Sequence, residues 1–67
     1  MKVKELVEKA YHKSKIKVIA DYGTRIVFDG AKDDVPDEVK DMEVDFFEPS
    51  FDYDDTAIHL KIFIFVK

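Results

Sequence analysis

The sequence predicts an α+β fold, in which an N-terminal helix packs on a four-stranded, mainly antiparallel sheet. Two observations carry this prediction. Apolar side chains recur at spacings of three and four over residues 2–13, which is the period of a helix. Alternating side chains predict strands at residues 16–20, 24–28, 42–47 and 56–66. The 67 residues therefore form a single domain, 1–67, with a short helical turn expected in the crossover at residues 30–41.

The last of these strands is expected to lie inside the sheet. One side of it carries Ile58, Leu60, Ile62, Ile64 and Val66. Its second half, residues 62–66, is apolar on both sides, which is typical of a strand covered on both faces. An exposed edge with this composition would favour aggregation. An interior position is favoured, for example in the strand order 2-1-4-3, although the order otherwise stays open.

The first helix and the first hairpin follow from local patterns. The apolar stripe of the helix consists of Val3, Leu6, Val7, Ala10 and Tyr11. A two-residue loop in the hairpin would mix the two faces of its strands. A three-residue loop that ends in a left-handed Gly23 keeps the faces separate. It predicts the pairs Ala20–Thr24, Val18–Ile26 and Ile16–Phe28.

The second half of the chain predicts a crossover and a second hairpin. Pro36 suits the first turn of a short helix, because proline loses no hydrogen bond there. The third strand is expected to end before Pro49, with residues 49–55 as the loop. Matching the apolar faces predicts the pairs Phe46–Ile58, Val44–Leu60 and Met42–Ile62. The same register predicts the outer pairs Glu43–Lys61 and Asp45–His59.

Charge is sorted along the chain. The formal net charge is −4, but residues 1–28 carry seven bases and three acids, whereas residues 29–55 carry twelve acids and two bases. There is no cysteine, which fits a reducing compartment. The apolar run near the C-terminus is too short to cross a bilayer. We expect a cytoplasmic protein without membrane contact.

The acidic segment admits three interpretations. It is a solvated loop that maintains solubility, a metal site, or a surface that imitates the phosphates of nucleic acid and binds a basic, nucleic-acid-binding protein. The metal interpretation rests on residues 52–55 and fails, because Ala57 and Phe63 stand where a calcium loop needs glycine and glutamate. No metal or cofactor is therefore expected. The candidate partner-binding acids are Asp33, Asp34, Asp37, Glu38, Asp41, Asp52, Asp54 and Asp55.

The sheet face away from the helix is a second candidate surface. One helix covers one face, so the apolar side chains on the other face predict a contact with a partner or a second copy. The candidate self-association residues are Phe47, Phe63, Phe65, Ile19 and Val27. Alternatively, the crossover folds over part of this face and buries Val35 and Val39 there.

Catalysis has little support in the sequence. The spacing of His12, His59, Ser14 and Ser50 assembles no nucleophile, base and orienting group. Direct binding of nucleic acid is not expected either, because acids dilute the basic face of the helix.

Four short segments carry a resemblance to a group of proteins. They are the start, residues 1–7, and the later Phe28-Asp29-Gly30, Asp33-Asp34-Val35-Pro36 and Glu43-Val44. Together they resemble short acidic open reading frames of unknown function from Firmicutes phages and integrated mobile elements. The chain departs from that group in its longer loop at residues 51–55. The resemblance implies a context in which small acidic proteins often inhibit host machinery, anti-CRISPR proteins among them.

The sequence therefore predicts a non-enzymatic interaction protein that binds a basic protein surface through residues 29–55. The alternative is a homodimer joined through the outer sheet face, with acids that serve solubility alone.

Overall fold

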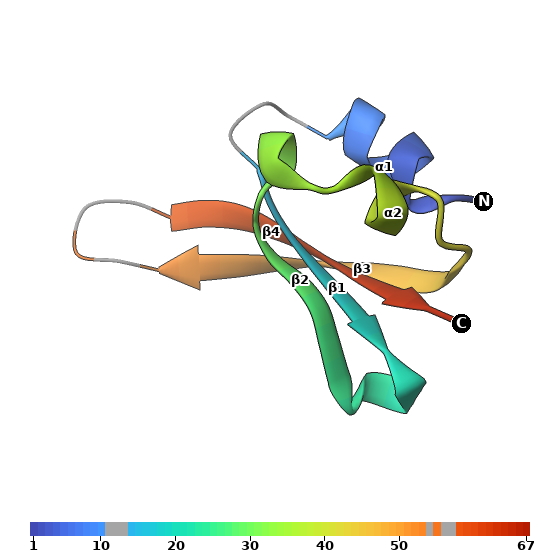
Figure 1. The fold of residues 1–67 in the computed structure, drawn as a ribbon. Helices are drawn as coiled ribbons and strands as arrows, with labels where there is room; N and C mark the ends of the chain where they lie inside the picture. The colour runs from blue at the N-terminus through green and yellow to red at the C-terminus, as the bar shows by residue number, and fades with distance from the viewer. Residues whose placement is uncertain (11–13, 54, 56–57) are drawn as a thin grey trace.

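The computed structural model describes residues 1–10, 14–53, 55 and 58–67. Its elements are two helices, α1 (Val3–Lys9) and α2 (Asp37–Lys40), and four strands, β1 (Lys15–Ala20), β2 (Arg25–Ala31), β3 (Val44–Tyr53) and β4 (Ile58–Val66). Single 3₁₀ turns span Asp21–Gly23 and Lys32–Asp34. The α+β prediction is confirmed (Figure 1). No helix in the described part of the chain is long and apolar enough to cross a membrane.

The four strands form one sheet in the order β2-β1-β4-β3, which places the last strand inside the sheet, as its apolar composition predicted. β1 pairs with β2, and β3 with β4, in antiparallel fashion. The two central strands, β1 and β4, run parallel, so the sheet is mixed. Their register sets Ile16 beside Ile62 and Val18 beside Ile64 on one face. This face forms the floor of the core.

Both helices cover that same face (Figure 1). The core cluster combines valines from α1 and the crossover with side chains of the central strands. Its buried members are Val3, Val7, Ile16, Val18, Ala20, Val35, Val39, Ile64 and Val66. The alternative in which the crossover buries Val35 and Val39 on the outer face is therefore wrong. α1 and the crossover share one layer, because their valines complete a single apolar cluster.

Helix α1 is shorter than the apolar stripe predicted. It ends at Lys9, where the backbone N–H of Ala10 donates to the carbonyls of Leu6 and Val7. Residues 11–13, which include Tyr11 and His12, lie outside the described residues. The predicted short helix is present as α2 and makes one turn, but Pro36 is its N-cap residue and not part of its first turn.

The predicted register of the first hairpin is wrong. Gly23 has a positive φ of 88°, as expected, but Asp21 and Tyr22 also take positive φ, so the connection uses four residues, 21–24. The observed pairs are Ala20–Arg25, Ile19–Ile26, Val18–Phe28 and Ile16–Gly30. The register shifts by one residue at a bulge between Val18 and Ile19. Phe28 is therefore opposite the buried Val18 and packs against the core.

The predicted end and register of the third strand are wrong as well. β3 continues through Pro49 to Tyr53, because an edge strand tolerates a residue without an N–H. The observed pairs include Val44–Val66, Phe46–Phe65, Phe47–Ile64, Ser50–Lys61 and Asp52–His59. A bulge between Val44 and Phe46 changes the face of every later residue. The expected pairs Glu43–Lys61 and Asp45–His59 therefore do not form.

The start of the chain closes one end of the β3 edge. The N–H of Val44 donates to the carbonyl of Met1 at 2.8 Å, and the N–H of Val3 donates to the carbonyl of Met42 at 3.0 Å. Glu43 accepts from the N-terminal ammonium at 3.3 Å. These bonds tie the end of the crossover to the start of α1.

We predict that Val39→Ala lowers the free energy of unfolding by about 2 kcal/mol, because it removes buried methyl groups from the core. Glu38→Ala, at the exposed neighbouring position of α2, is the matched control and should change it by less than about 0.5 kcal/mol. Urea denaturation measures both. Equal effects of the two substitutions would show that the crossover does not belong to the core.

Candidate interaction surfaces

Five of the eight candidate partner-binding acids lie together on the crossover. Their side chains are all exposed: Asp33, Asp34, Asp37, Glu38 and Asp41. Asp55 is also exposed, but it lies in the connection between β3 and β4 and not in the crossover. Asp54 and the side chain of Asp52 lie outside the described residues. The described acids thus form two separate groups.

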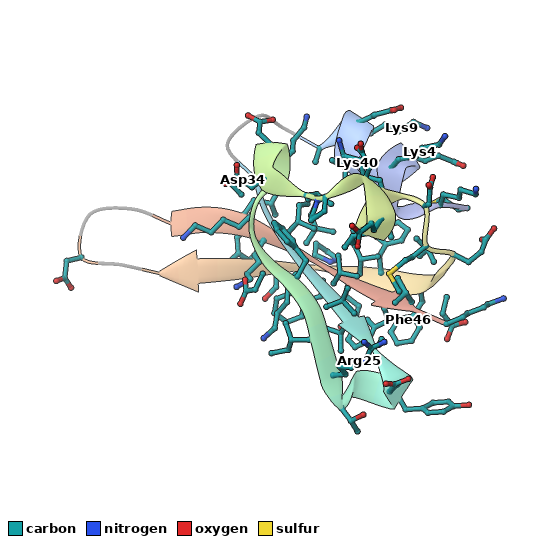
Figure 2. All side chains as sticks on the ribbon, in the orientation of Figure 1. Lys4, Lys9, Arg25, Asp34, Lys40 and Phe46 are labelled. Atoms are coloured by element: carbon teal, nitrogen blue, oxygen red, sulfur yellow. The ribbon has the colours of Figure 1, made fainter. Side chains whose placement is uncertain are left out.

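The acidic crossover, which we define as residues 32–41, is anchored at both ends of its acidic stretch. Val35 and Val39 are 4% and 7% exposed. The N–H of Lys32 donates to the carbonyl of Ser14 at 3.2 Å, and its Nζ donates to the carbonyl of Ala10. Within α2, the N–H of Lys40 donates to the carbonyl of Pro36 at 3.0 Å. The exposed carboxylates therefore stand on a folded segment; Asp34 and Lys40 are labelled in Figure 2.

The outer sheet face, opposite the helices, has a polar half and an apolar half. In the polar half, Lys17 and Lys61 place their ammonium groups 5.6 and 5.9 Å from the centre of the Phe63 ring. Lys61 also pairs with Asp29 at 3.1 Å. Phe63 is therefore covered in part by the chain's own lysines. A dry interface over the whole face would have to bury these charges.

The apolar half is built from the strand ends nearest the turn between β1 and β2. The rings of Phe46 and Phe65 stack with centres 4.4 Å apart and planes 13° apart. Ile19, beside Phe65 in the sheet, is only 8% exposed although it lies on this face. Ile26 pairs with Ile19 and is exposed. These four side chains form the continuous apolar part of the face.

A groove of about 530 Å³ opens at this apolar half. It lies between the 3₁₀ turn Asp21–Gly23, the start of β3 and the end of β4. Its apolar lining comes from Ile19, Phe46, Phe65 and Val66, with Tyr22 as a further wall. Its polar lining residues are Asp21, Asp45 and Lys67.

The structure divides the predicted self-association residues. Ile19, Phe63 and Phe65 lie on the outer face, as predicted. Phe47 pairs with Ile64 and so lies on the opposite, helix-covered face, where it is still half exposed. Val27 packs against the buried core. Both misplacements follow from the two bulges, which shift the alternation by one residue.

Two residues of the apolar half, Phe46 and Ile26, were missed by the sequence prediction. The signal that could have found them is the run of consecutive apolar residues at 26–28 and at 46–47. Strict alternation cannot place neighbouring residues on one face, so such runs indicate either a strand covered on both faces or a bulge.

The turn beside the groove is strained. Asp21 and Tyr22 have φ of 53° and 58°, a conformation that costs non-glycine residues about 1–3 kcal/mol each. Two contacts support it: Arg25 Nε donates to Asp21 Oδ2 at 3.0 Å, and Thr24 Oγ1 donates to the carbonyl of Asp21 at 2.6 Å. The side chain of Tyr22 is fully exposed, so no packing explains its retention there. The strain holds an aromatic side chain at the edge of the groove.

The described residues offer no cluster of three or more His, Cys, Asp or Glu side chains that could hold a metal ion. Neither histidine considered for catalysis has a described side chain, since His12 is outside the described residues and His59 is described in its backbone alone. Ser14 is buried, and its Oγ has no hydrogen-bond partner among the described residues.

No family model, curated protein or solved structure matches this chain. The resemblance to phage reading frames therefore stays a prediction, and the two surfaces must be interpreted from their own geometry.

We predict that Tyr22→Asn raises the free energy of unfolding by about 1 kcal/mol, because asparagine tolerates a positive φ better than tyrosine does. Phe51→Asn, which removes an exposed ring from the extended backbone of β3, is the control and should give no gain. Thermal and urea denaturation measure both. A loss of stability in Tyr22→Asn would mean that the tyrosine ring itself stabilises the fold.

Proposed function

We propose that this chain is a non-enzymatic, cytoplasmic interaction protein that binds a basic protein surface through its acidic crossover. In this proposal it is encoded by a phage or mobile element and inhibits a nucleic-acid-binding partner by imitating nucleic acid. One observation carries the proposal: five exposed carboxylates stand on a segment whose two valines are buried in the core.

The anchoring supports binding rather than solubility alone. A flexible acidic loop would have to be ordered when a partner binds, which costs affinity. The bonds of Lys32 and the burial of Val35 and Val39 order this segment in the free protein. Carboxylates held in this way attract a basic surface from a distance and speed association.

The charge distribution supports a basic partner. The crossover carries five of its seven charges as exposed carboxylates, and the ion pair between Lys40 and Asp37 is long, at 4.0 Å. A protein groove that binds the closely spaced phosphates of DNA is lined with Lys and Arg, so it is complementary to such a surface. We expect binding that weakens as salt rises.

A homodimer through the outer face has weaker support. Two of its predicted contact residues are not available there: Phe47 lies on the helix-covered face, and Val27 packs against the core. An interface over the whole face would also bury the charged groups of Lys17, Lys61 and Asp29.

We predict that replacing Asp33, Asp34, Asp37 and Asp41 by Asn abolishes binding to a basic protein partner and leaves the fold intact. The probes are purified DNA-binding proteins of Firmicutes, a CRISPR effector nuclease among them, immobilised at low salt with and without competing duplex DNA. A bound probe should be displaced by the duplex. Affinity should fall at least about a hundredfold in the variant, because four charge contacts are lost.

A control variant separates position from total charge. Substitution of Glu8 and Glu48 by Lys also takes the formal net charge from −4 to zero, but leaves every candidate partner-binding acid unchanged. It should bind within about threefold of the wild type. The proposal fails if both variants lose affinity equally, or if the wild type binds none of the probes at low salt.

A further inference from the structure

The groove on the outer face is joined to the acidic crossover by a short acidic stretch. From Asp41 the chain runs through Glu43 to Asp45, which lines the groove, and then enters β3 at the stacked ring of Phe46. The hydrogen bonds of Val3 and Val44 fix this stretch against the start of the chain. The apolar groove therefore lies only a few residues along the chain from the last acid of the crossover.

The walls of the groove suit an apolar anchor. Ile19 is almost fully buried at its base, and the stacked rings of Phe46 and Phe65 form one side. A hollow of about 530 Å³ lies in the size range of pockets that bind small ligands or single large side chains. Aromatic side chains seated in such pockets commonly dominate the energy of an interface.

The charged residues of the lining determine which residues can flank the apolar side chain in the groove. Asp45 is exposed beside Phe46, and Asp21 lies on the opposite side at the turn, where it is held by Arg25. Lys67 is the cation of the lining. Asp45 is the last carboxylate of the stretch that leads from the crossover, and it favours a segment whose flanking residues are basic.

We propose that this groove binds an aromatic side chain carried by a Lys- and Arg-rich segment of a protein partner. The inference rests on the proposed function, because the acidic crossover engages the basic residues around that anchor. Asp21 and Tyr22 of the strained turn lie at the edge of this groove. The crossover attracts the segment, and the groove supplies the apolar contact that keeps it bound.

The charges disfavour two other occupants. A second copy would have to offer an exposed aromatic residue. Among those outside the groove's stacked pair that the structure describes, Tyr22 follows Asp21, Phe47 precedes Glu48, and Phe51 precedes Asp52. Each would bring a carboxylate toward Asp45. A nucleic acid would bring phosphates toward the same group.

Three peptides of eleven residues test the proposal on ¹⁵N-labelled protein by NMR titration. The first has a central Phe flanked on each side by Lys and Arg residues, the second has Ala in place of Phe, and the third keeps Phe but has Glu in place of the bases. We expect the first to shift the amide signals of Gly23 and Phe46. The second and third should bind at least about tenfold more weakly.

A matched pair of variants locates the binding. Phe46 and Phe47 are neighbours with the same exposure, 48%, on opposite faces of the sheet. Phe46→Ala should weaken the first peptide at least about tenfold, whereas Phe47→Ala should stay within about twofold of the wild type. Circular dichroism confirms that each variant is folded.

The outcomes separate this inference from the proposed function. If the first two peptides bind equally and Phe46→Ala has no effect, the groove inference is wrong, although binding to the acids stands. If the third peptide binds as well as the first, the anchor does not need a basic segment, and the inference is wrong. If the Gly23 and Phe46 signals move with protein concentration alone, the occupant is a second copy, and the inference is also wrong. If the variant with Asn at positions 33, 34, 37 and 41 binds the first peptide as tightly as the wild type does, and Phe46→Ala still weakens that binding, the groove inference stands and the crossover proposal fails.

Discussion

Burial of Val35 and Val39 on the same sheet face as α1 is the constraint on which the rest of the structure depends. The described part of the chain has two short helices, and both cover the central strands from one side. The crossover therefore lies in the same layer as α1. Its valines point toward the sheet, and its acids are exposed to solvent. For the same reason, no helix in the described part of the chain covers the outer face. The ordered acidic surface and the bare apolar groove are two consequences of one packing arrangement.

The two surfaces complement each other in a binding protein. Carboxylates act over roughly a Debye length of 8 Å at physiological salt, so they speed encounter and choose the sign of the partner's charge. A single exposed charge pair contributes at most about 1 kcal/mol, so the carboxylates act as a group. An apolar side chain that enters the groove beside Phe46 and Phe65 supplies the short-range energy that a charged surface lacks. The lysines over Phe63 restrict this contact to the end of the sheet near the turn.

The sequence predicted the layers of this fold better than its register. The apolar run of residues 62–66 was sufficient to place the last strand inside the sheet, because the composition of a strand reports its cover directly. It could not place Phe46 and Ile26 on the outer face, since each lies next to a bulge whose position depends on tertiary packing. Pro49 misled the prediction of the strand end, because its cost depends on whether β3 is an edge. The composition was sufficient to identify the acids of the crossover. It did not predict that the crossover is anchored, because that depends on the packing of Val39 in the same core cluster as the valines of α1.

Hydrogen exchange at the amides of Lys40 and Met42 tests the central claim, that the acidic crossover is an ordered part of the core, most directly. These N–H groups donate to the carbonyls of Pro36 and Val39 at 3.0 and 3.1 Å, beside the buried side chain of Val39. If the claim is right, both amides exchange only when the domain opens, with protection approaching that of the Val18 amide in β1. Exchange near the rate of an unstructured peptide would contradict it, because the carboxylates would then belong to a solvated loop.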